Sequence, residues 1–228
     1  MKLAFLGTGA AFSSERYNCA VVVNDHILLD AGAPLLPHMH RLGIDPAAID
    51  LLFVSHFHGD HVLGLASFLL HRAFVAPAPL VVVGPQDTPQ RLEELGQLAW
   101  RADWPEIRSR LSIEHQPASA EGKAAGVDFE SRRLVHGTEG GTGYRIHIDG
   151  RTLVYAGDTE PTPELDELVR GADVAITEAT GPGSVPSHTP WEEALALRDR
   201  HPGTRFIFTH VFAGELEGAA SDLTVVEV

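Results

Sequence analysis

Short apolar runs rich in valine, isoleucine, leucine and phenylalanine recur along the chain, and glycine-rich or polar turns separate them. Such runs are typical of buried strands when turn residues bound them. They predict strands over residues 3–6, 20–23, 27–29, 51–54, 80–83, 111–114, 127–133, 144–148, 152–155, 174–176 and 206–208.

Longer stretches carry their apolar residues at helical spacing. They predict helices over residues 62–71, 89–100, 163–169 and 191–199. Thr189 and Pro190 directly precede the last of these stretches, where they match a helix cap and a first-turn proline. Glycine, proline and small polar residues predict flexible loops over 117–126 and 181–190.

The order of these elements predicts the fold class. Strands outnumber helices, and they fall into two similar half-sets with helices packed outside, which indicates an α/β protein built as a four-layer αββα sandwich. The chain has 228 residues and is 44% hydrophobic, which suits one large domain or two tightly merged halves. Since no long linker interrupts the pattern, we expect one domain over residues 1–228.

Composition excludes several classes of protein. Charged residues make up 21% of the chain and the mean hydropathy is close to zero, so a disordered, collagenous or coiled-coil chain is excluded. The longest uncharged apolar stretch, residues 62–70, covers less than half of the about 20 residues that a membrane-spanning helix needs. We therefore expect no association with a membrane.

Two features near the start of the chain bear on its compartment. The apolar run over residues 3–6 breaks at Gly7, which predicts a first strand and a turn rather than a signal peptide. Cys19 is the single cysteine of the chain and has no partner for an internal disulfide, so we expect a cytoplasmic protein.

The chain is strongly acidic. It carries 17 basic and 31 acidic residues, a formal net charge of −14, and no run of lysine or arginine stands out. Binding along an extended nucleic acid depends on several phosphate contacts from clustered cations, so a long nucleic-acid tract is disfavoured as a partner. For the surface as a whole, the acidic balance indicates solubility.

The most informative segment follows the predicted strand over residues 51–54. It places His56, His58, Asp60 and His61 within six positions in the pattern HxHxDH, with Gly59 between them. An extended loop directs His56 and His58 the same way, while Asp60 and His61 project from the start of the following helix. This spacing predicts two ligand sets a few ångströms apart, as two-metal hydrolytic sites require.

Further histidine and aspartate residues follow the ends of other predicted strands. His136 comes after the strand over 127–133, Asp158 after that over 152–155, and His210 after that over 206–208. Each one alone is more typical of a hydrogen-bonded surface or core group than of a metal ligand. Together with the HxHxDH segment, they predict that the strand ends converge on one rim around a metal site.

In this order, the residues resemble the metallo-β-lactamase superfamily over nearly the whole chain. The resemblance implies that one metal is held by His56, His58 and His136, the other by Asp60, His61 and His210, and that Asp158 bridges the two. Five neutral imidazoles and two carboxylates suit two zinc ions, since zinc accepts nitrogen and oxygen ligands without redox chemistry. The ligand types also admit manganese or iron.

Shorter matches resemble the RNase Z group and its phosphodiesterase relatives. They are the Phe5–Gly9 opening with Glu15 and Arg16, the segment around Gly143–Ile146 after His136, Thr177–Thr180, and Ser187–Thr189. The last two resemble the loops that carry that group's proton-handling residues. By this resemblance Glu178 and His188 are candidate catalytic residues, with His188 as general acid assisted by Glu178, and Asp60 as a further acceptor of the proton of the attacking water.

Chemistry explains why such a site would cleave phosphodiesters. The positive charge of two divalent cations exceeds the negative charge of the two carboxylates, so an anionic diester is attracted to a locally cationic site in an acidic protein. A water shared by both metals would have its pKa lowered toward neutrality and would attack as a bridging hydroxide. We therefore expect a metal-dependent hydrolase, most similar to a phosphodiesterase.

Alternative functions stay open. An acyl, lactone or thioester hydrolase would use the same metal site, a mononuclear iron dioxygenase can share HxHxDH, and a non-catalytic scaffold would need no metal chemistry. A β-lactamase proper is disfavoured because Cys19 lies in the wrong segment for a metal ligand. A flavodiiron-type oxidoreductase would place an acidic residue where His58 stands.

The expected substrate is small. Bacterial RNase Z proteins have a protruding arm that grips transfer RNA, and we find no glycine-rich and basic insertion of that kind in the sequence. This favours a small phosphodiester, a cyclic phosphate or a short nucleic-acid end over transfer RNA. A homodimer is implied by the resemblance alone.

Several other residues attract attention without a catalytic role. We expect Thr8, Arg16 and Arg145 to brace loops rather than to contact phosphate. Trp100 and Trp104 lie beside a predicted helix, and large aromatic side chains in such places fill the core more often than they stack on bases.

Overall fold

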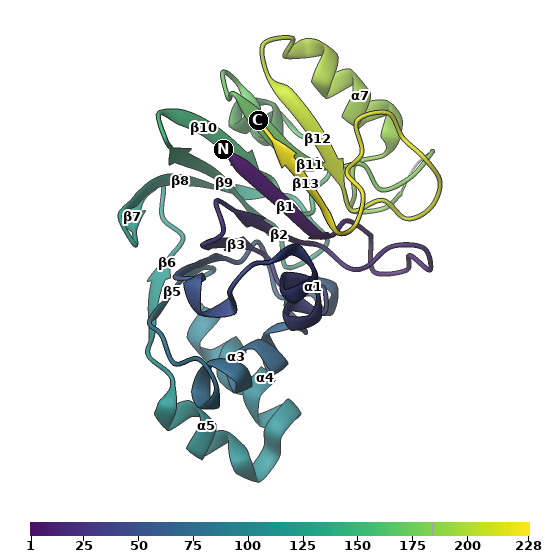
Figure 1. Ribbon diagram of the computed structural model, residues 1–228. Helices are drawn as coiled ribbons and strands as arrows, with labels where there is room; N and C mark the ends of the chain where they lie inside the picture. The colour runs from purple at the N-terminus through teal and green to yellow at the C-terminus, as the bar shows by residue number, and fades with distance from the viewer. Residues whose placement is uncertain (184) are drawn as a thin grey trace.

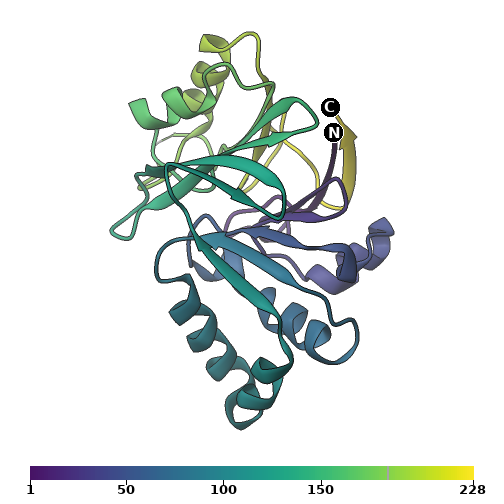
Figure 2. The ribbon, with the colours of Figure 1, turned by 90° about the vertical axis from the view of Figure 1, so that its left-hand side faces the viewer.

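The computed structural model describes residues 1–183 and 185–228, so Ser184, within the loop predicted over 181–190, lies outside the described residues. In the described part of the chain the strands form a seven-stranded and a six-stranded sheet. Figures 1 and 2 show the two sheets packed on each other with helices on their outer faces. The predicted α/β fold, a four-layer αββα sandwich, is confirmed.

The first sheet is built mainly from the first half of the chain, with the order β13-β1-β2-β3-β4-β5-β6. Its strands β13 to β3 pair antiparallel, whereas β3 to β6 pair parallel. Figure 1 shows the two ends of the chain side by side, because the last strand pairs with the first. The strands are β1 (Lys2–Gly7), β2 (Ala20–Val23), β3 (Ile27–Leu29), β4 (Leu51–Phe53), β5 (Leu80–Gly84), β6 (Ile113–Pro117) and β13 (Thr224–Glu227).

The second sheet has the order β12-β11-β10-β9-β8-β7. Strands β7 to β10 pair antiparallel, and β10, β11 and β12 pair parallel. Since β8 and β10 both run opposite to β9, the strands β8, β10, β11 and β12 end at the same edge of the sheet. The strands are β7 (Glu121–Ala124), β8 (Val127–Leu134), β9 (Gly141–Ile148), β10 (Arg151–Tyr155), β11 (Val174–Glu178) and β12 (Arg205–Thr209).

Helices cover the outer face of each sheet (Figure 2). Four of them pack their apolar side chains on the first sheet: α1 (Leu35–Leu42), α3 (Leu65–Phe74), α4 (Thr88–Trp100) and α5 (Trp104–Arg110). Two pack on the second sheet: α6 (Pro163–Val169) and α7 (Trp191–Arg200). The short α2 (Gly59–Val62) and the 3₁₀ turns η1 (Pro46–Ala48) and η2 (Arg101–Asp103) connect them.

The core between the sheets explains why the strand segments read as continuous apolar runs. Successive side chains of a strand point to opposite faces, and here both faces are buried. In β1, Leu3 and Phe5 enter the core between the sheets, while Ala4 and Leu6 enter the core under the first set of helices. The Phe53 and Phe129 rings, one from each sheet, meet edge to face at 5.4 Å.

The structure corrects some predicted elements. The loop predicted over 117–126 contains β7, an edge strand that turns back into β8 through Ala125 and Gly126, both at positive φ. The helix predicted over 62–71 is divided into α2 and α3, and between them the Gly64 N–H donates to the Ala31 carbonyl oxygen at 2.8 Å instead of to a carbonyl of the helix. The strand predicted over 111–114 is displaced to β6, and α1, α5 and β13 were not predicted.

In the part of the chain that the structure describes, no helix combines the length and the apolar composition that crossing a bilayer requires.

Candidate metal centre

The segment after β4 changes from extended chain to helix within a few residues. His58 has an extended backbone and is the N-cap residue of α2, so Asp60 and His61 lie on the first turn of that helix. This change of direction separates His56 and His58 from Asp60 and His61 into two groups, as the spacing predicts. The packing also needs a glycine at position 32, where a Cβ would lie 1.7 Å from the Asp60 carbonyl oxygen.

The remaining predicted ligands come from the second sheet. His136, Asp158 and His210 follow β8, β10 and β12, three strands that end at the same edge. All three residues are buried, with 2–3% of their surface exposed. The strand ends therefore bring them to the HxHxDH segment of the first sheet.

The seven predicted ligands form two groups, and a third set of possible ligand residues, Asp158, Glu178, His188 and His210, overlaps the second group. His56, His58 and His136 form one, and Asp60, His61, Asp158 and His210 form the other, with the possible ligand atoms of each group within 4.8 Å of one another. His136 Nε2 lies 3.0 Å from His58 Nδ1, and His210 Nε2 lies 3.2 Å from Asp60 Oδ2.

Asp158 lies between the two groups. Its Oδ2 atom is 3.1 Å from His210 Nε2 and 3.3 Å from His61 Nε2. The same oxygen is 3.9 Å from the Nε2 atoms of both His56 and His136. A single carboxylate thus faces histidines of both groups.

The outer nitrogens of these histidines are held by hydrogen-bond partners. His61 Nδ1 donates to Asp30 Oδ2 at 2.8 Å, and His136 Nδ1 donates to the Ser187 carbonyl oxygen at 2.8 Å. The inner atoms His56 Nε2, His61 Nε2 and Asp158 Oδ1 are buried and have no hydrogen-bond partner among the described residues. Oriented histidines with unpartnered inner nitrogens are what a metal site requires, so the residues fit a pair of divalent cations.

The pKa shifts of the residues in the two ligand groups also favour bound cations. Burial alone would lower the pKa of the His61 and His210 imidazoles, but the Asp158 carboxylate outweighs it and raises both well above the ordinary value. Burial, together with the neighbouring His61, lowers the pKa of His56 to about 2, so that imidazole is neutral and its lone pair is free for a cation. Positive charge is therefore favoured beside Asp158.

Glu178 and His188 adjoin the second group. Glu178 ends β11 and is buried, and its Oε2 accepts a hydrogen bond from His188 Nδ1 at 2.9 Å. Its Oε1 accepts from the Thr159 backbone N–H at 2.5 Å, which fixes the carboxylate. Burial alone would raise the pKa of Glu178, but the hydrogen bonds from His188 and His210 lower it, so the group is ionised.

Asp30 and Thr180 belong to the site although they were not singled out from the sequence. Asp30 is fully buried after β3, where it accepts hydrogen bonds from the Ser55 hydroxyl and the Tyr155 hydroxyl in addition to His61. Thr180 donates to Glu178 and lies 3.2 Å from His210 Nδ1. A lone carboxylate directly after the apolar run over 27–29 is the signal that could have identified Asp30.

The bracing roles predicted for three residues are confirmed. Arg16 donates to the Thr8 hydroxyl and to the Ala220 carbonyl oxygen, and the Thr8 hydroxyl donates to Asp222. Arg145 donates to the Leu168 carbonyl oxygen at 2.7 Å. Likewise, Trp104, the first residue of α5, is buried against Gly96 of α4, and Trp100 is partly buried and donates its indole N–H to the Ala66 carbonyl oxygen.

A cavity of about 860 Å³ opens above the two ligand groups. Its floor is formed by residues of the metal centre and His188, and small or apolar residues form its wall. They are Ala10, Ala11, Phe12, His58, Gly59, Asp60, His136, Gly137, Asp158, Thr180, Gly181, Pro182, Val185, Ser187, His188, His210 and Phe212.

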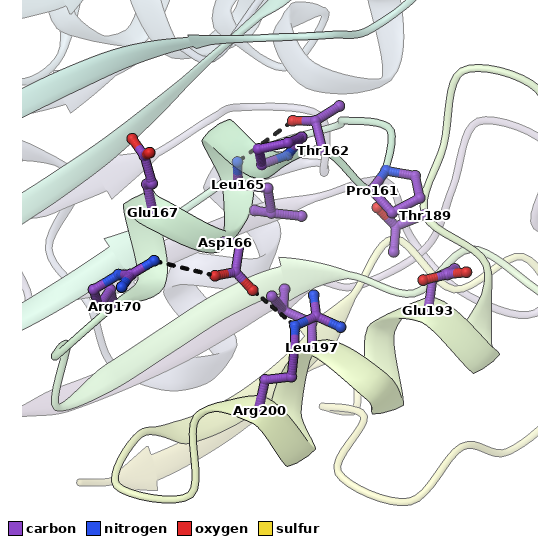
Figure 3. Close-up of a pocket in the computed structure, with 11 residues that line it drawn as sticks. Pro161, Thr162, Leu165, Asp166, Glu167, Arg170, Thr189, Glu193, Leu197 and Arg200 are labelled. Atoms are coloured by element: carbon purple, nitrogen blue, oxygen red, sulfur yellow. Dashed lines mark hydrogen bonds and ion pairs between the residues drawn. The ribbon is translucent and has the colours of Figure 1, made fainter.

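A separate cavity of about 380 Å³ lies between α6 and α7, and Figure 3 shows the charged groups along it. Asp166 Oδ1 lies 2.8 Å from Arg200 Nε, and Asp166 Oδ2 lies 3.6 Å from Arg170 Nη2. These charges are paired with one another, and the described residues that line the cavity include no histidine. We assign this cavity to the packing of the two helices.

Comparisons with known proteins agree with this arrangement. The family described as anti-Pycsar protein Apyc1 matches residues 1–204. A ribonuclease Z of Pyrobaculum arsenaticum is 30% identical over 233 residues, which cover 85% of this chain and 78% of the relative.

Two solved structures share the fold. The metallo-β-lactamase fold protein YhfI from Bacillus subtilis has a TM-score of 0.78 at 17% identity, over 99% of each chain. The short form of human tRNase Z, ELAC1, has a TM-score of 0.76 at 20% identity, over 100% of this chain and 99% of that one. The chain therefore belongs to the anti-Pycsar protein Apyc1 family, and it is a metal-dependent hydrolase of the RNase Z-like branch of the metallo-β-lactamase superfamily.

Proposed function

We propose that the chain is a dinuclear-metal phosphodiesterase that acts on small or terminal phosphodiesters. The observation that carries the proposal is the position of Asp158 Oδ2 between the two ligand groups. In this proposal His56, His58 and His136 hold one ion, Asp60, His61 and His210 hold the other, and Asp158 bridges them. Zinc suits this donor set, and manganese or iron is the alternative.

The chain's own residues divide the remaining work. Two divalent ions at these positions would lower the pKa of water and neutralise charge on the phosphate oxygens. Asp60, which is partly exposed in the floor of the cavity, accepts the proton of the attacking water. His188 donates a proton to the leaving oxygen, and Glu178 holds the His188 ring through Nδ1, so that Nε2 is the nitrogen free to serve the substrate.

The cavity wall supports a small substrate. Of the described residues that line the cavity, none is a lysine or an arginine, and the chain as a whole carries a net charge of −14. Contacts to a long phosphate backbone would need such cations. A volume of about 860 Å³ lies within the range of about 300–1,000 Å³ that is usual for small-molecule sites.

The segment between Asp158 and His210 also supports a small substrate. Its described residues form α6, β11, α7 and β12 and the loops between them, and this supports the proposal that the chain lacks an arm for transfer RNA. The curated relative is named a ribonuclease Z, and its name denotes cleavage of RNA. We carry over the phosphodiester chemistry and propose a cyclic phosphate or a nucleic-acid end rather than transfer RNA as the substrate.

Metal analysis and a substrate panel test the proposal. We expect purified protein to contain close to two zinc or similar ions per chain and to hydrolyse bis(p-nitrophenyl) phosphate. Asp158→Ala should lose both the metal and the activity, whereas Asp199→Ala, at an exposed carboxylate on α7, should keep both.

The same substrate panel distinguishes a phosphodiesterase from the alternative, an acyl, lactone or thioester hydrolase. It compares activated diesters, cyclic nucleotides, lactones and thioesters under identical conditions. Faster hydrolysis of lactones or thioesters than of every diester would replace the phosphodiesterase proposal with an acyl hydrolase at the same site.

Two further proposals concern the state of the protein. We propose a cytoplasmic location, supported by the single and buried Cys19, and a homodimer, supported by the family resemblance. Fractionation of the source cells and light scattering of the purified chain test them.

A further inference from the structure

The segment Ser187–Thr189 crosses the ends of three strands of the second sheet and forms hydrogen bonds at each of them. The Ser187 carbonyl oxygen accepts a hydrogen bond from His136 Nδ1 at 2.8 Å, beyond the end of β8. His188 Nδ1 donates to Oε2 of Glu178, the last residue of β11, at 2.9 Å. One short segment therefore carries the proposed acid and also contacts a proposed metal ligand.

Thr189 fixes the other end of this segment. Its hydroxyl donates to the Thr159 carbonyl oxygen at 2.7 Å, and Thr159 directly follows Asp158 beyond β10. The Thr159 N–H in turn donates to Glu178 Oε1 at 2.5 Å. The Thr189 carbonyl oxygen accepts from the Thr180 N–H at 3.0 Å. With this end held by two strand ends, the contact of Ser187 decides how the first part of the segment lies against the metal centre.

The backbone of Ser187 has an uncommon conformation. Its φ of 66° lies in the left-handed region, which glycine adopts readily and β-branched residues almost never adopt. Non-glycine residues held in this region are concentrated at functional sites. The hydrogen bond to His136 uses the Ser187 carbonyl oxygen and not the hydroxyl. The conformation at position 187, rather than the side chain, therefore aims the accepting group.

The same hydrogen bond depends on which nitrogen of His136 carries the proton. His136 Nε2 faces the first ligand group and lies 3.0 Å from His58 Nδ1. When Nε2 is a metal ligand, the ring proton lies on Nδ1 and is donated to the Ser187 carbonyl oxygen. A ring with its proton on Nε2 would instead present a lone pair to that oxygen. Metal binding therefore favours this position of Ser187, and by reciprocity this position of Ser187 favours metal binding.

We propose that Ser187 is a positioning residue that couples the proposed acid to metal binding. Its carbonyl oxygen holds His136, and its left-handed backbone places His188 beside Glu178. This inference rests on the proposed phosphodiesterase function and adds to it a residue that acts through its backbone. The acid is then held in place in the metal-loaded site and is less ordered in the metal-free one.

Three substitutions at position 187 separate the backbone from the hydroxyl. Ser187→Val places a β-branched side chain at positive φ, which should turn the carbonyl away and lower zinc affinity by about tenfold or more in competition with a chelator. Ser187→Gly favours positive φ, and Ser187→Ala removes the hydroxyl alone. Both should keep zinc affinity within about twofold of wild type.

Ala125→Val is the matched control for backbone strain. Ala125 is at positive φ in the turn that enters β8, whereas His136 follows the end of that strand. This variant should resist urea less well than wild type, as Ser187→Val should, but bind zinc normally. Wild-type zinc affinity in Ser187→Val, or equal losses in Ser187→Gly or Ser187→Ala, would overturn the positioning role.

Amide hydrogen exchange of the wild type gives a readout that needs no substitution. Zinc should slow exchange of the His188 and Thr189 amides by about fivefold or more, because it stabilises the contact of Ser187 with His136. The Ala125–Gly126 turn should exchange equally with and without zinc. Equal exchange of the His188 and Thr189 amides in the two states would overturn the coupling, even if Ser187→Val failed to fold.

The dependence of rate on the leaving group tests the effect on the acid. At saturating zinc, Ser187→Val should slow diesters with alkoxide leaving groups by about tenfold or more and bis(p-nitrophenyl) phosphate by less than about threefold. Equal losses on both kinds of diester would overturn the placement of His188 by Ser187. If the wild type hydrolysed no diester, the proposed function would fail, and zinc competition and amide exchange would still decide for or against the role of Ser187.

Discussion

Glu178 Oε2 lies 2.9 Å from His188 Nδ1, and the same oxygen lies 3.5 Å from His210 Nδ1. One buried carboxylate therefore orients both a proposed metal ligand and the proposed acid. Because a carboxylate only accepts hydrogen bonds, the His188 proton on Nδ1 is directed at Glu178. This relationship connects the proposed acid to the metal centre through Glu178, and substitution of His188 itself tests whether protonation of the leaving group can be lost while the metal is retained.

His188→Ala should retain the metal and lose rate chiefly with poor leaving groups. An alkoxide leaving group needs a proton, so its hydrolysis should slow by about 10²–10⁴-fold, whereas loss of p-nitrophenolate should slow by less than about tenfold. Metal content and a series of diesters with graded leaving groups provide the measurement. His147→Ala, on the exposed face of β9, is the control. Loss of metal from His188→Ala would show that its assigned role is wrong.

Asp30→Asn should weaken metal retention without unfolding the protein. The Asp30 carboxylate holds His61 through Nδ1, and loss of such a partner lowers metal affinity by about 10–100-fold. Competition with a chelator measures the change.

Tyr155→Phe is the matched control for Asp30→Asn, because it removes a hydrogen bond to Asp30 and leaves His61 in place. It should lower the free energy of unfolding by about 1 kcal/mol and leave metal affinity nearly unchanged. Metal affinity of Asp30→Asn equal to that of wild type would contradict the positioning role of Asp30.

Asp166→Asn should reduce stability at neutral pH but not in acid. Burial alone would raise the pKa of Asp166, but hydrogen bonds from Arg200 and His201 outweigh it and lower the pKa below its ordinary value. A lowered carboxyl pKa contributes stability above the unfolded pKa, and that contribution is lost as the pH falls through the folded pKa. We expect a loss of about 0.5–1 kcal/mol at pH 7, since the side chain is partly exposed.

Urea unfolding of Asp166→Asn and wild type at a series of pH values checks this prediction. The difference between the two proteins should shrink as the pH falls below about 4. Asp199 on α7 pairs with Arg198 at the exposed surface, so the control variant Asp199→Asn should show no such pH dependence. A difference that grew toward acid would contradict the assignment.

Cys19 should be inert in the native protein. Burial, reinforced by the nearby Asp158 and Asp60 carboxylates, raises the pKa of the Cys19 thiol to about 11, so the reactive thiolate is scarce at pH 8. Alkylation should therefore be slower than that of an exposed thiol by about two orders of magnitude. Mass spectrometry after iodoacetamide treatment, with and without urea, measures it. Rapid labelling of the native chain would contradict the burial of this strand end.

Much of the fold could be predicted because its strands are buried on both faces. Residues 20–23, 27–29 and 163–169 coincide with β2, β3 and α6, whose apolar pattern alone defines them. In contrast, β7 has the sequence Glu-Gly-Lys-Ala and becomes a strand through its pairing with β8. Such an edge strand carries no apolar signal of its own.

The missed helix α1 illustrates a second limit. It contains a proline in its first turn and His38, whose buried ring is held by the Leu6 carbonyl oxygen. The local sequence around these residues has no clear helix signal, and the contact that holds the His38 ring comes from a strand distant in sequence.

The sequence identifies some residues of the site and misses others. Seven ligand-type residues could be located because each follows a strand or belongs to HxHxDH, and the structure brings all seven together. The role of Asp30 depends on contacts with Ser55, His61 and Tyr155, which lie in other segments of the chain. Local spacing contains no information about those contacts.

The two ligand groups lie across the junction of the sheets, since the HxHxDH segment follows β4 of the first sheet while His136, Asp158 and His210 follow strands of the second. Bound ions would therefore tether the front half of the chain to the back half. At about 1,000 times the dissociation constant, such a tether adds about 4 kcal/mol to the folded state. Chelation should consequently loosen the strand ends at this junction, with faster amide exchange there, before the interior of either sheet opens.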